Sequence, residues 1–120
     1  MSTQTLSARN TTFRIGWMAL LAVSALAALS HILLAFVVKD EATLFIGWAA
    51  FNLYSTLVLY IPFQHGEKWA WYATWILVIG FAIAIFFNTQ IGIFYRGAAV
   101  LMAVALLLTR PAFFQKESGA

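Results

Sequence analysis

Four side chains that can bind a ligand or form hydrogen bonds stand inside long apolar stretches of this sequence: His31, Asn52, Tyr95 and Arg96. Polar and ionisable groups at membrane depth are costly to bury, so each is a candidate for a functional site. The guanidinium of Arg96 matches a phosphate or a carboxylate. His31 and Asn52 can form hydrogen bonds between helices. If these residues converge, they form a small polar cavity with a binding role.

A purely structural role is the simpler interpretation of the same residues. Arg96 can extend to lipid headgroups, or donate to the exposed carbonyls of a neighbouring helix. His31 and Asn52 can serve only to join helices by hydrogen bonds. Asn88 is a further candidate for the cluster. Because the sequence does not give the rotation of each helix about its axis, the convergence of these residues is a hypothesis.

Several kinds of chemistry lack the residues that they need. A cation–proton exchanger, such as the small multidrug exporters of similar length, needs a carboxylate within the membrane. The four carboxylates all lie in expected loops or in the tail: Asp40, Glu41, Glu67 and Glu117. The second histidine, His65, is expected on the opposite side of the membrane from His31, which excludes a bis-histidine haem. The sequence has no cysteine and no set of zinc ligands. We predict no catalytic residue, no metal and no cofactor, and leave an enzymatic role open.

The elements that must position these residues are four apolar runs, at about 13–38, 43–63, 69–87 and 91–109. Apolar residues make up 63% of the chain and charged residues 9%, against about 45–50% and about 25% in soluble domains. So few charges cannot cover a water-soluble surface. Each run has about 19–26 residues, and about 20 residues of helix cross the hydrocarbon core of a bilayer. The sequence therefore predicts an all-α, integral membrane four-helix bundle.

The polar segments between the runs are three to five residues long, so consecutive helices are expected to be antiparallel neighbours. Gly66 suits the end of one helix and Glu67 the start of the next. Pro111 is expected to stop the fourth helix. Residues 1–12 are predicted to form a cytoplasmic leader, and residues 110–120 a cytoplasmic tail. The first run is too long for the apolar region of a signal peptide, which favours an uncleaved helix.

Basic residues set the predicted orientation. Lys39 and Arg96 would lie outside, and five others would lie in the cytoplasm: Arg9, Arg14, Lys68, Arg110 and Lys116. Five against two follows the positive-inside rule and predicts an N-in/C-in, multi-pass protein of the cell (inner) membrane. His31, Asn52 and Arg96 would then lie in the outer half. Basic residues scattered in this way argue against a nucleic-acid partner, which requires them on one face.

The turn between the second and third runs has the most distinctive local sequence, Gly66-Glu67-Lys68-Trp69-Ala70-Trp71-Tyr72. It resembles a turn pattern, Gly-Glu-Lys/Arg followed by Trp-Ala-Trp, of small uncharacterised prokaryotic four-helix integral membrane proteins, which are loosely DoxX-like in size. The match covers fewer than ten residues. The resemblance implies a four-helix bundle and carries over no catalytic residue.

Two functions from different classes fit this sequence. The first is an accessory subunit or an oligomeric bundle of a membrane complex, a homo-oligomer included, which associates through faces of small residues. The expected faces are Ser24/Ala28, Ala70/Thr74, Gly80/Ala84 and Ala99/Ala103. The alternative is a small transporter, or a protein that binds a lipid or another hydrophobic ligand through the polar cluster. The abundance of alanine and aromatic residues favours the first.

Overall fold

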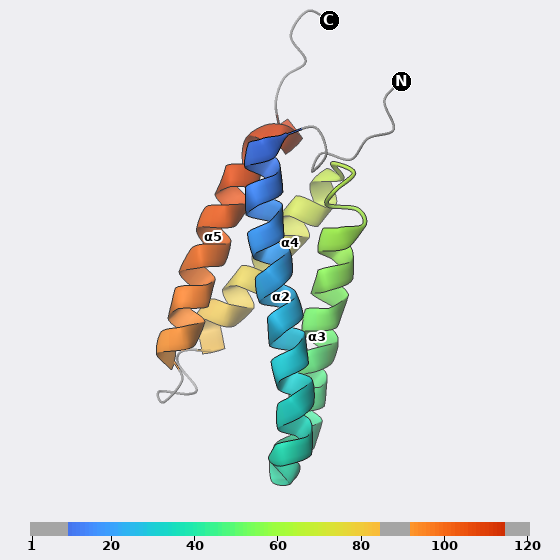
Figure 1. The fold of residues 1–120 in the computed structure, drawn as a ribbon, viewed down its shortest axis with the longest axis vertical. Helices are drawn as coiled ribbons and strands as arrows, with labels where there is room; N and C mark the ends of the chain where they lie inside the picture. Colours follow the sequence, from blue (N-terminus) through green and yellow to red (C-terminus); the bar gives the residue numbers. More distant parts are fainter. Residues whose placement is uncertain (1–9, 85–91, 115–120) are drawn as a thin grey trace, which may run out of the picture.

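The computed structural model describes residues 10–84 and 92–114 of the 120-residue chain. These residues form four α-helices and one short 3-10 helix (Figure 1): α2 (Thr11–Val37), η1 (Lys39–Glu41), α3 (Ala42–Tyr60), α4 (Lys68–Ala84) and α5 (Gly92–Phe114). Within the same ranges no strand occurs. The prediction of an all-α chain with four long helices is confirmed.

Three segments are long and apolar enough to cross a membrane. They are Thr11–Val37 with 27 residues, Lys39–Tyr60 with 22 and Phe94–Phe114 with 21. The fourth helix, α4, is also apolar and has 17 described residues. At a rise of about 1.5 Å per residue these span about 25 Å. The end that the sequence predicts for this helix, at residue 87, lies outside the described residues.

The helix α2 begins two residues before its predicted start, because Asn10 caps it. The side-chain oxygen of Asn10 accepts a hydrogen bond from the backbone N–H of Phe13 at 3.1 Å. This bond satisfies one of the N–H groups that a helix start leaves without a partner in the helix itself. The first element is therefore fixed by a polar residue that lies outside the apolar run.

The turn after α3 follows from a proline and a glycine. Pro62 has no N–H to donate to the carbonyl of Val58, and Phe63 N donates to that carbonyl instead, at 3.0 Å. The chain leaves the helix at Tyr60, three residues before the predicted end. Gly66 then has a φ of 79°, a left-handed conformation that glycine adopts without strain. The short reversal lets α4 begin at Lys68.

The last helix does not stop at Pro111, as the sequence predicts; it continues to Phe114. A proline inside a helix removes one backbone hydrogen bond and costs about 3 kcal/mol or more. Burial of the residues beyond it offsets this cost. The ring of Phe113 lies 4.8 Å from that of Phe63 and 5.7 Å from that of Phe13, centroid to centroid. All three phenylalanines are buried, and they tie the ends of α2, α3 and α5 together.

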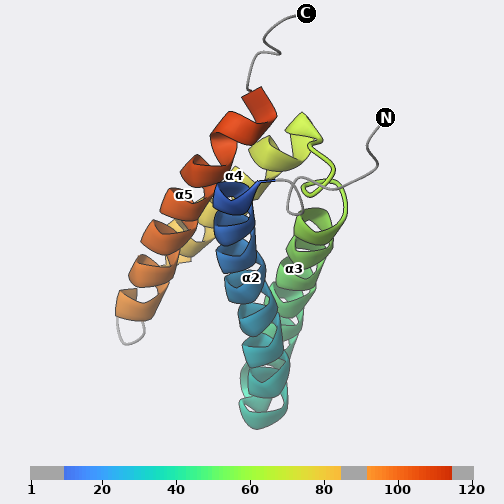
Figure 2. The same ribbon diagram turned by 45° about the horizontal axis from the view of Figure 1, so that its top comes forward.

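The central helix of the bundle is α2. It packs along α3 and against α5, while α4 packs mainly against α5 and touches α3 only little. Consecutive helices run antiparallel, so the start of α2 and the end of α5 lie together (Figure 1). At the opposite end the α2–α3 pair extends farther than α5, as both views show (Figures 1 and 2).

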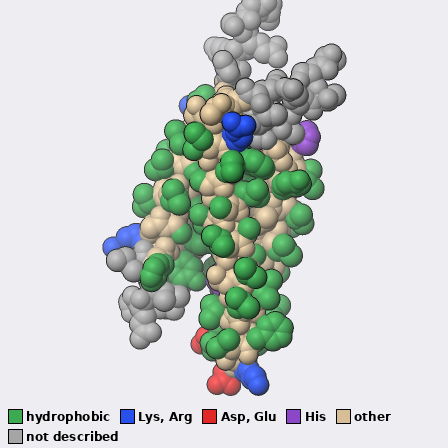
Figure 3. Space-filling model, in the orientation of Figure 1, with side chains coloured by type: hydrophobic (Ala, Val, Ile, Leu, Met, Phe, Trp, Pro, Cys, Tyr) green, Lys and Arg blue, Asp and Glu red, His purple; other side chains and the backbone are tan. Residues whose placement is uncertain are grey.

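Apolar side chains cover most of the face shown in Figure 3, and charged side chains lie near the ends of the helices there. Phe36 and Phe94 are each 76% exposed, and Leu26 is 63% exposed. The buried polar residues among the described ones are Ser24, His31, Asn52, Thr74 and Thr109. Apolar groups outside and polar groups inside are what a lipid solvent favours, because lipid cannot hydrogen-bond to a polar group.

The close contact between α2 and α5 depends on Gly16. A Cβ atom at this position would lie 2.6 Å from the carbonyl oxygen of Ala105 and 2.9 Å from Cγ2 of Thr109. The first of these neighbours is backbone, which a rotamer change cannot move. Small residues allow such close approach of helices where the surrounding solvent is lipid.

Gly16→Ala should therefore lower the stability of the bundle by about 1–3 kcal/mol, the usual cost of overpacking. Gly97→Ala is the matched control, because a Cβ atom there meets nothing within 4 Å. The control should be neutral or slightly stabilising, since alanine favours helix over glycine by about 1 kcal/mol. Thermal unfolding of both variants in the same detergent measures the difference. Equal midpoints for the two would show that α2 and α5 do not approach so closely.

Candidate functional site

The structure brings His31, Asn52 and Tyr95 together, from α2, α3 and α5. His31 Nδ1 lies 3.3 Å from the Asn52 side-chain nitrogen, and His31 Nε2 lies 3.3 Å from the Tyr95 hydroxyl oxygen. His31 is 5% exposed and Asn52 is fully buried. Three of the four residues singled out in the sequence thus form one hydrogen-bonded cluster across three helices.

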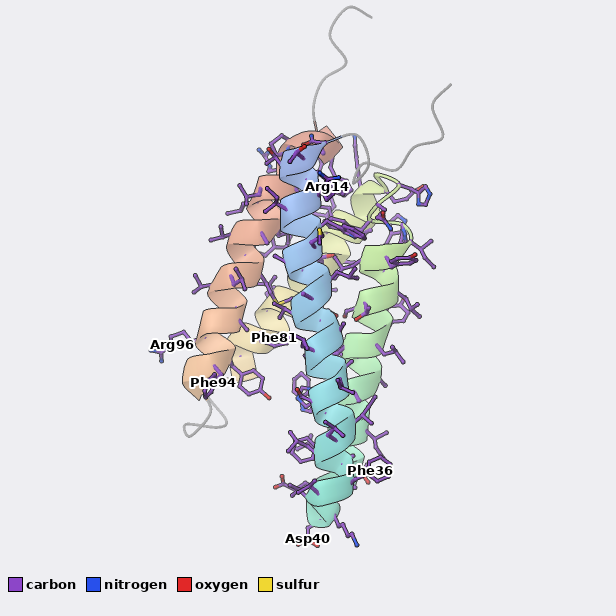
Figure 4. All side chains as sticks on the ribbon, in the orientation of Figure 1. Arg14, Phe36, Asp40, Phe81, Phe94 and Arg96 are labelled. Atoms are coloured by element: carbon purple, nitrogen blue, oxygen red, sulfur yellow. The ribbon has the colours of Figure 1, made fainter. Side chains whose placement is uncertain are left out.

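Arg96 is not part of this cluster. Its side chain is exposed and points away from α2 (Figure 4). Neighbouring residues of an α-helix are about 100° apart around its axis. Because Tyr95 is directed toward His31, the next residue is directed outward. Asn88, the further candidate, lies outside the described residues. A binding role for any of these side chains stays a prediction.

One stripe of α2 explains why His31 faces α3. Trp17, Ser24 and His31 are seven residues apart, which is close to two helical turns, so they lie on one side of the helix. The Trp17 indole N–H donates to the Leu59 carbonyl at 2.7 Å, and the Ser24 hydroxyl donates to the Asn52 carbonyl at 3.0 Å. Each residue of the stripe therefore forms a hydrogen bond with α3.

The direction of the two hydrogen bonds of His31 depends on the tautomer of its ring. The Asn52 side-chain nitrogen donates to the Trp48 carbonyl at 2.8 Å, which fixes the orientation of the amide. Its second hydrogen points to His31 Nδ1, and an amide nitrogen can only donate. A donation from Asn52 requires that His31 Nδ1 be the acceptor and that Nε2 carry the proton. In this Nε2–H tautomer the ring N–H donates to the Tyr95 oxygen, which leaves the tyrosine's own hydroxyl proton for another acceptor.

Aromatic rings enclose the cluster. The imidazole of His31 is stacked with the rings of Phe45 and Trp48, each with its centroid 6.1 Å away. The ring of Tyr95 packs against Phe81 of α4, with 5.7 Å between centroids. These rings hold the imidazole and the phenol in place. They also reduce the access of other polar groups to them.

A cavity of about 400 Å³ borders His31 and Tyr95. It lies between α2, α4 and α5 and is lined by Leu26, Ala27, Ser30, His31, Leu34, Phe81, Phe94, Tyr95 and Ala98. Most of this lining is apolar. Leu26 and Phe94 are both exposed, so the cavity opens to the outside of the bundle between α2 and α5.

A second, larger cavity lies between α3 and α4, where the two helices touch little. Its volume is about 610 Å³. Its lining is Thr43, Leu44, Gly47, Trp48, Phe51, Ile76, Ile79, Gly80 and Ile83. Thr43 is the only residue of this set with a polar side chain other than the indole of Trp48. The wall contains two glycines, which leave room for close approach by another chain.

Sequence reasoning missed the residues that orient the cluster. Trp48 supplies the carbonyl that orients Asn52, and Phe45 and Phe81 supply its aromatic walls. The spacing of Trp17, Ser24 and His31 would have indicated which face of α2 meets α3. As for metals, no group of three or more His, Asp or Glu gathers within residues 10–84 and 92–114, so those ranges offer no ready metal site.

No family model, curated protein or solved structure matches this chain. Its function must be inferred from its own geometry.

The bond between Asn52 and His31 can be tested by a double-mutant cycle with Asn52→Leu and His31→Leu. Their coupling energy should be about 0.6 kcal/mol and at most about 1.7, the range of hydrogen bonds between helices in membranes. Ser55→Ala serves as control because Ser55 donates only to the Phe51 carbonyl of its own helix. The coupling energy between Ser55→Ala and His31→Leu should be zero. Unfolding in one detergent supplies all the energies, and zero coupling for the Asn52 pair would contradict the cluster.

Proposed function

We propose that this chain is a small multi-pass integral membrane protein with four crossings and both ends in the cytoplasm. Three described segments of 21 to 27 residues have the length and hydropathy for crossings. The fourth crossing would be α4, completed by residues beyond Ala84. Since the start of α2 and the end of α5 lie together (Figure 1), an even number of crossings fits this arrangement. The distribution of basic residues supports the orientation, and the cell (inner) membrane is the proposed location.

Within that membrane the chain acts by association, as an accessory subunit or an oligomeric bundle of a larger complex. The open face between α3 and α4 is the observation that supports this role. Gly47 and Gly80 in its wall permit the close approach of another helix. Of the small residues expected to form such faces, Ser24, Ala28, Ala70, Thr74 and Ala99 are buried within the bundle itself. They hold this chain together and leave the α3–α4 face for a partner.

The turn from Gly66 to Tyr72 fits this proposal without adding an activity. The Trp71 indole N–H donates to the Leu106 carbonyl at 3.1 Å, which fastens α4 to α5. The ring of Trp71 also lies 5.3 Å from that of Phe114. These contacts give the turn a structural role in this chain. Its resemblance to small DoxX-like membrane bundles stays a prediction.

A second candidate function is favoured by the cavity beside His31 and Tyr95. A small transporter, or a protein that binds a lipid or another hydrophobic ligand, needs an apolar cavity with a few convergent polar groups. This cavity has that composition. Arg96 would then contribute only from outside the cavity.

The orientation can be tested with single cysteines, because the sequence has none of its own. Asp40→Cys lies in the turn between α2 and α3, and Glu67→Cys in the turn before α4; both positions are exposed. A maleimide that cannot cross membranes should label Asp40→Cys in intact cells and leave Glu67→Cys unlabelled. Glu67→Cys should be labelled only after the cells are opened. The reverse pattern would invert the orientation, and labelling of both in intact cells would refute the four crossings.

Association can be tested by purification in a mild detergent, followed by native mass spectrometry. The wild-type chain should appear as an oligomer or with a partner subunit. Gly47→Leu should lower the association constant about five- to hundredfold, the equivalent of the usual cost of overpacking. Gly97→Leu is the control on α5, since a Cβ atom meets nothing within 4 Å at either glycine. A wild-type chain that is monomeric and free of partners would overturn the proposal of association.

A further inference from the structure

We infer that the cavity between α2 and α5 holds an acyl chain whose carbonyl oxygen accepts a hydrogen bond from the Tyr95 hydroxyl. This inference rests on the membrane placement proposed above and extends the second candidate function. The ester carbonyl of a glycerolipid and the carboxyl group of a free fatty acid share this chemistry. The glycerolipid is the source to which the position of the cavity points.

The lining of the cavity fits a hydrocarbon chain. Leu34 and Ala27 of α2 face Phe81 of α4 and Ala98 of α5 across it. Its volume of about 400 Å³ is near the lower limit of ordinary ligand cavities, which hold roughly 300–1,000 Å³. That space suits one chain rather than a complete lipid. With Leu26 and Phe94 exposed at its edge, the rest of a lipid would lie outside the bundle.

The donor is the hydroxyl proton of Tyr95 in the Nε2–H tautomer of His31. In this tautomer Asn52 donates to His31 Nδ1, and His31 Nε2–H donates to the Tyr95 oxygen. The Tyr95 oxygen is then the acceptor, and its own O–H is available. Tyr95 lines the cavity, where an unpaired hydroxyl surrounded by apolar side chains is costly. A carbonyl oxygen, which only accepts, complements this group.

The position of Tyr95 along α5 supports a lipid ester as the acceptor. Tyr95 is the fourth residue of that helix, so it lies about one turn from its described start. Arg96, on the same turn, is exposed and directed outward (Figure 4). In a bilayer such an arginine extends to the headgroup phosphates. Ester carbonyls lie next to those phosphates at the edge of the hydrocarbon core, which makes the glycerolipid ester the acceptor in our proposal.

The inference can be tested by titrating the purified protein with three lipids under native mass spectrometry. The probes are a diester phosphatidylglycerol with palmitoyl chains, the diether phosphatidylglycerol of equal chain length, and palmitic acid. The diether lipid keeps the chains and headgroup but lacks the carbonyl. Wild-type protein should bind the diester about five- to tenfold more tightly than the diether, the ratio that one hydrogen bond of ordinary strength accounts for.

Three variants separate the hydroxyl from the rest of the site. Tyr95→Phe keeps the ring against Phe81 and should remove the preference for the diester. Tyr60→Phe changes a tyrosine that is 57% exposed on α3 and should retain it. Ala98→Phe fills the cavity and should weaken binding of all three probes at least about tenfold. Circular dichroism confirms that each variant is folded.

Two results would overturn the inference: a wild-type protein without preference for the diester, or a preference that survives in Tyr95→Phe. Palmitic acid binding more tightly than the diester, with a loss in Tyr95→Phe, would support the acyl carbonyl and assign the site to free fatty acids. A carbonate wash of membranes tests the membrane placement separately. A chain that washes off overturns both proposals, whereas a retained chain without lipid preference overturns only this one.

Discussion

The rest of the structure depends on the hydrogen bonds that converge on Asn52. Its backbone carbonyl accepts from the hydroxyls of Ser24 and Thr56, and its side-chain nitrogen donates toward Trp48 and His31. One buried residue of α3 thus forms hydrogen bonds with two residues of α2, Ser24 and His31. The energy of each bond is modest, yet a buried amide without partners would be costly among apolar groups. This requirement fixes the rotation of α2 and α3 about their axes and their register along each other.

The side-chain oxygen of Asn52 is buried and has no partner among the described residues, so the two donated bonds alone orient the amide.

With α2 and α3 fixed relative to each other, α4 and α5 close one end of the bundle and leave the other end open. Near its start α2 meets α5 at Gly16, where backbone approaches backbone, and the rings of Phe13, Phe63 and Phe113 fill the same end. Toward the opposite end α2 and α5 diverge (Figures 1 and 2). A long side chain is needed to bridge the widening gap, and Tyr95 reaches His31 across it. The cavity is therefore a consequence of how the helices diverge, and it lies beside the side chains that bridge the gap.

The sequence predicted the features that depend on composition and length. Helical class, the number of long helices and their antiparallel order all follow from apolar runs separated by short polar segments. It also indicated His31, Asn52 and Tyr95, because polar residues are rare in such runs. It could not show that Tyr95 belongs to the cluster and that Arg96 does not. The position of a residue along a helix can be predicted from the sequence, but the rotation of the helix about its axis depends on the helices packed against it. The continuation of α5 beyond Pro111 was missed for a similar reason: the burial of Phe113 offsets the cost of the proline, and it depends on residues far away in the sequence. Gly16 is one of seven glycines in the sequence. Its role in helix packing becomes apparent only from the position of the Ala105 carbonyl in the folded chain.

The open end has a consequence for stability. In the described bundle α3 and α4 touch only little, and α2 and α5 diverge toward the end that carries Tyr95 (Figure 1), so local opening should start at that end. Anything that fills the cavity adds contacts between the diverging ends of α2 and α5, and binding to the folded state alone raises stability by mass action. The cluster at Asn52 lies between the two ends. Its hydrogen bonds hold His31 in a fixed orientation on the side of α2 that faces α3. A site arranged in this way keeps its polar groups in position when the cavity is empty, and the apolar walls adjust to what enters it.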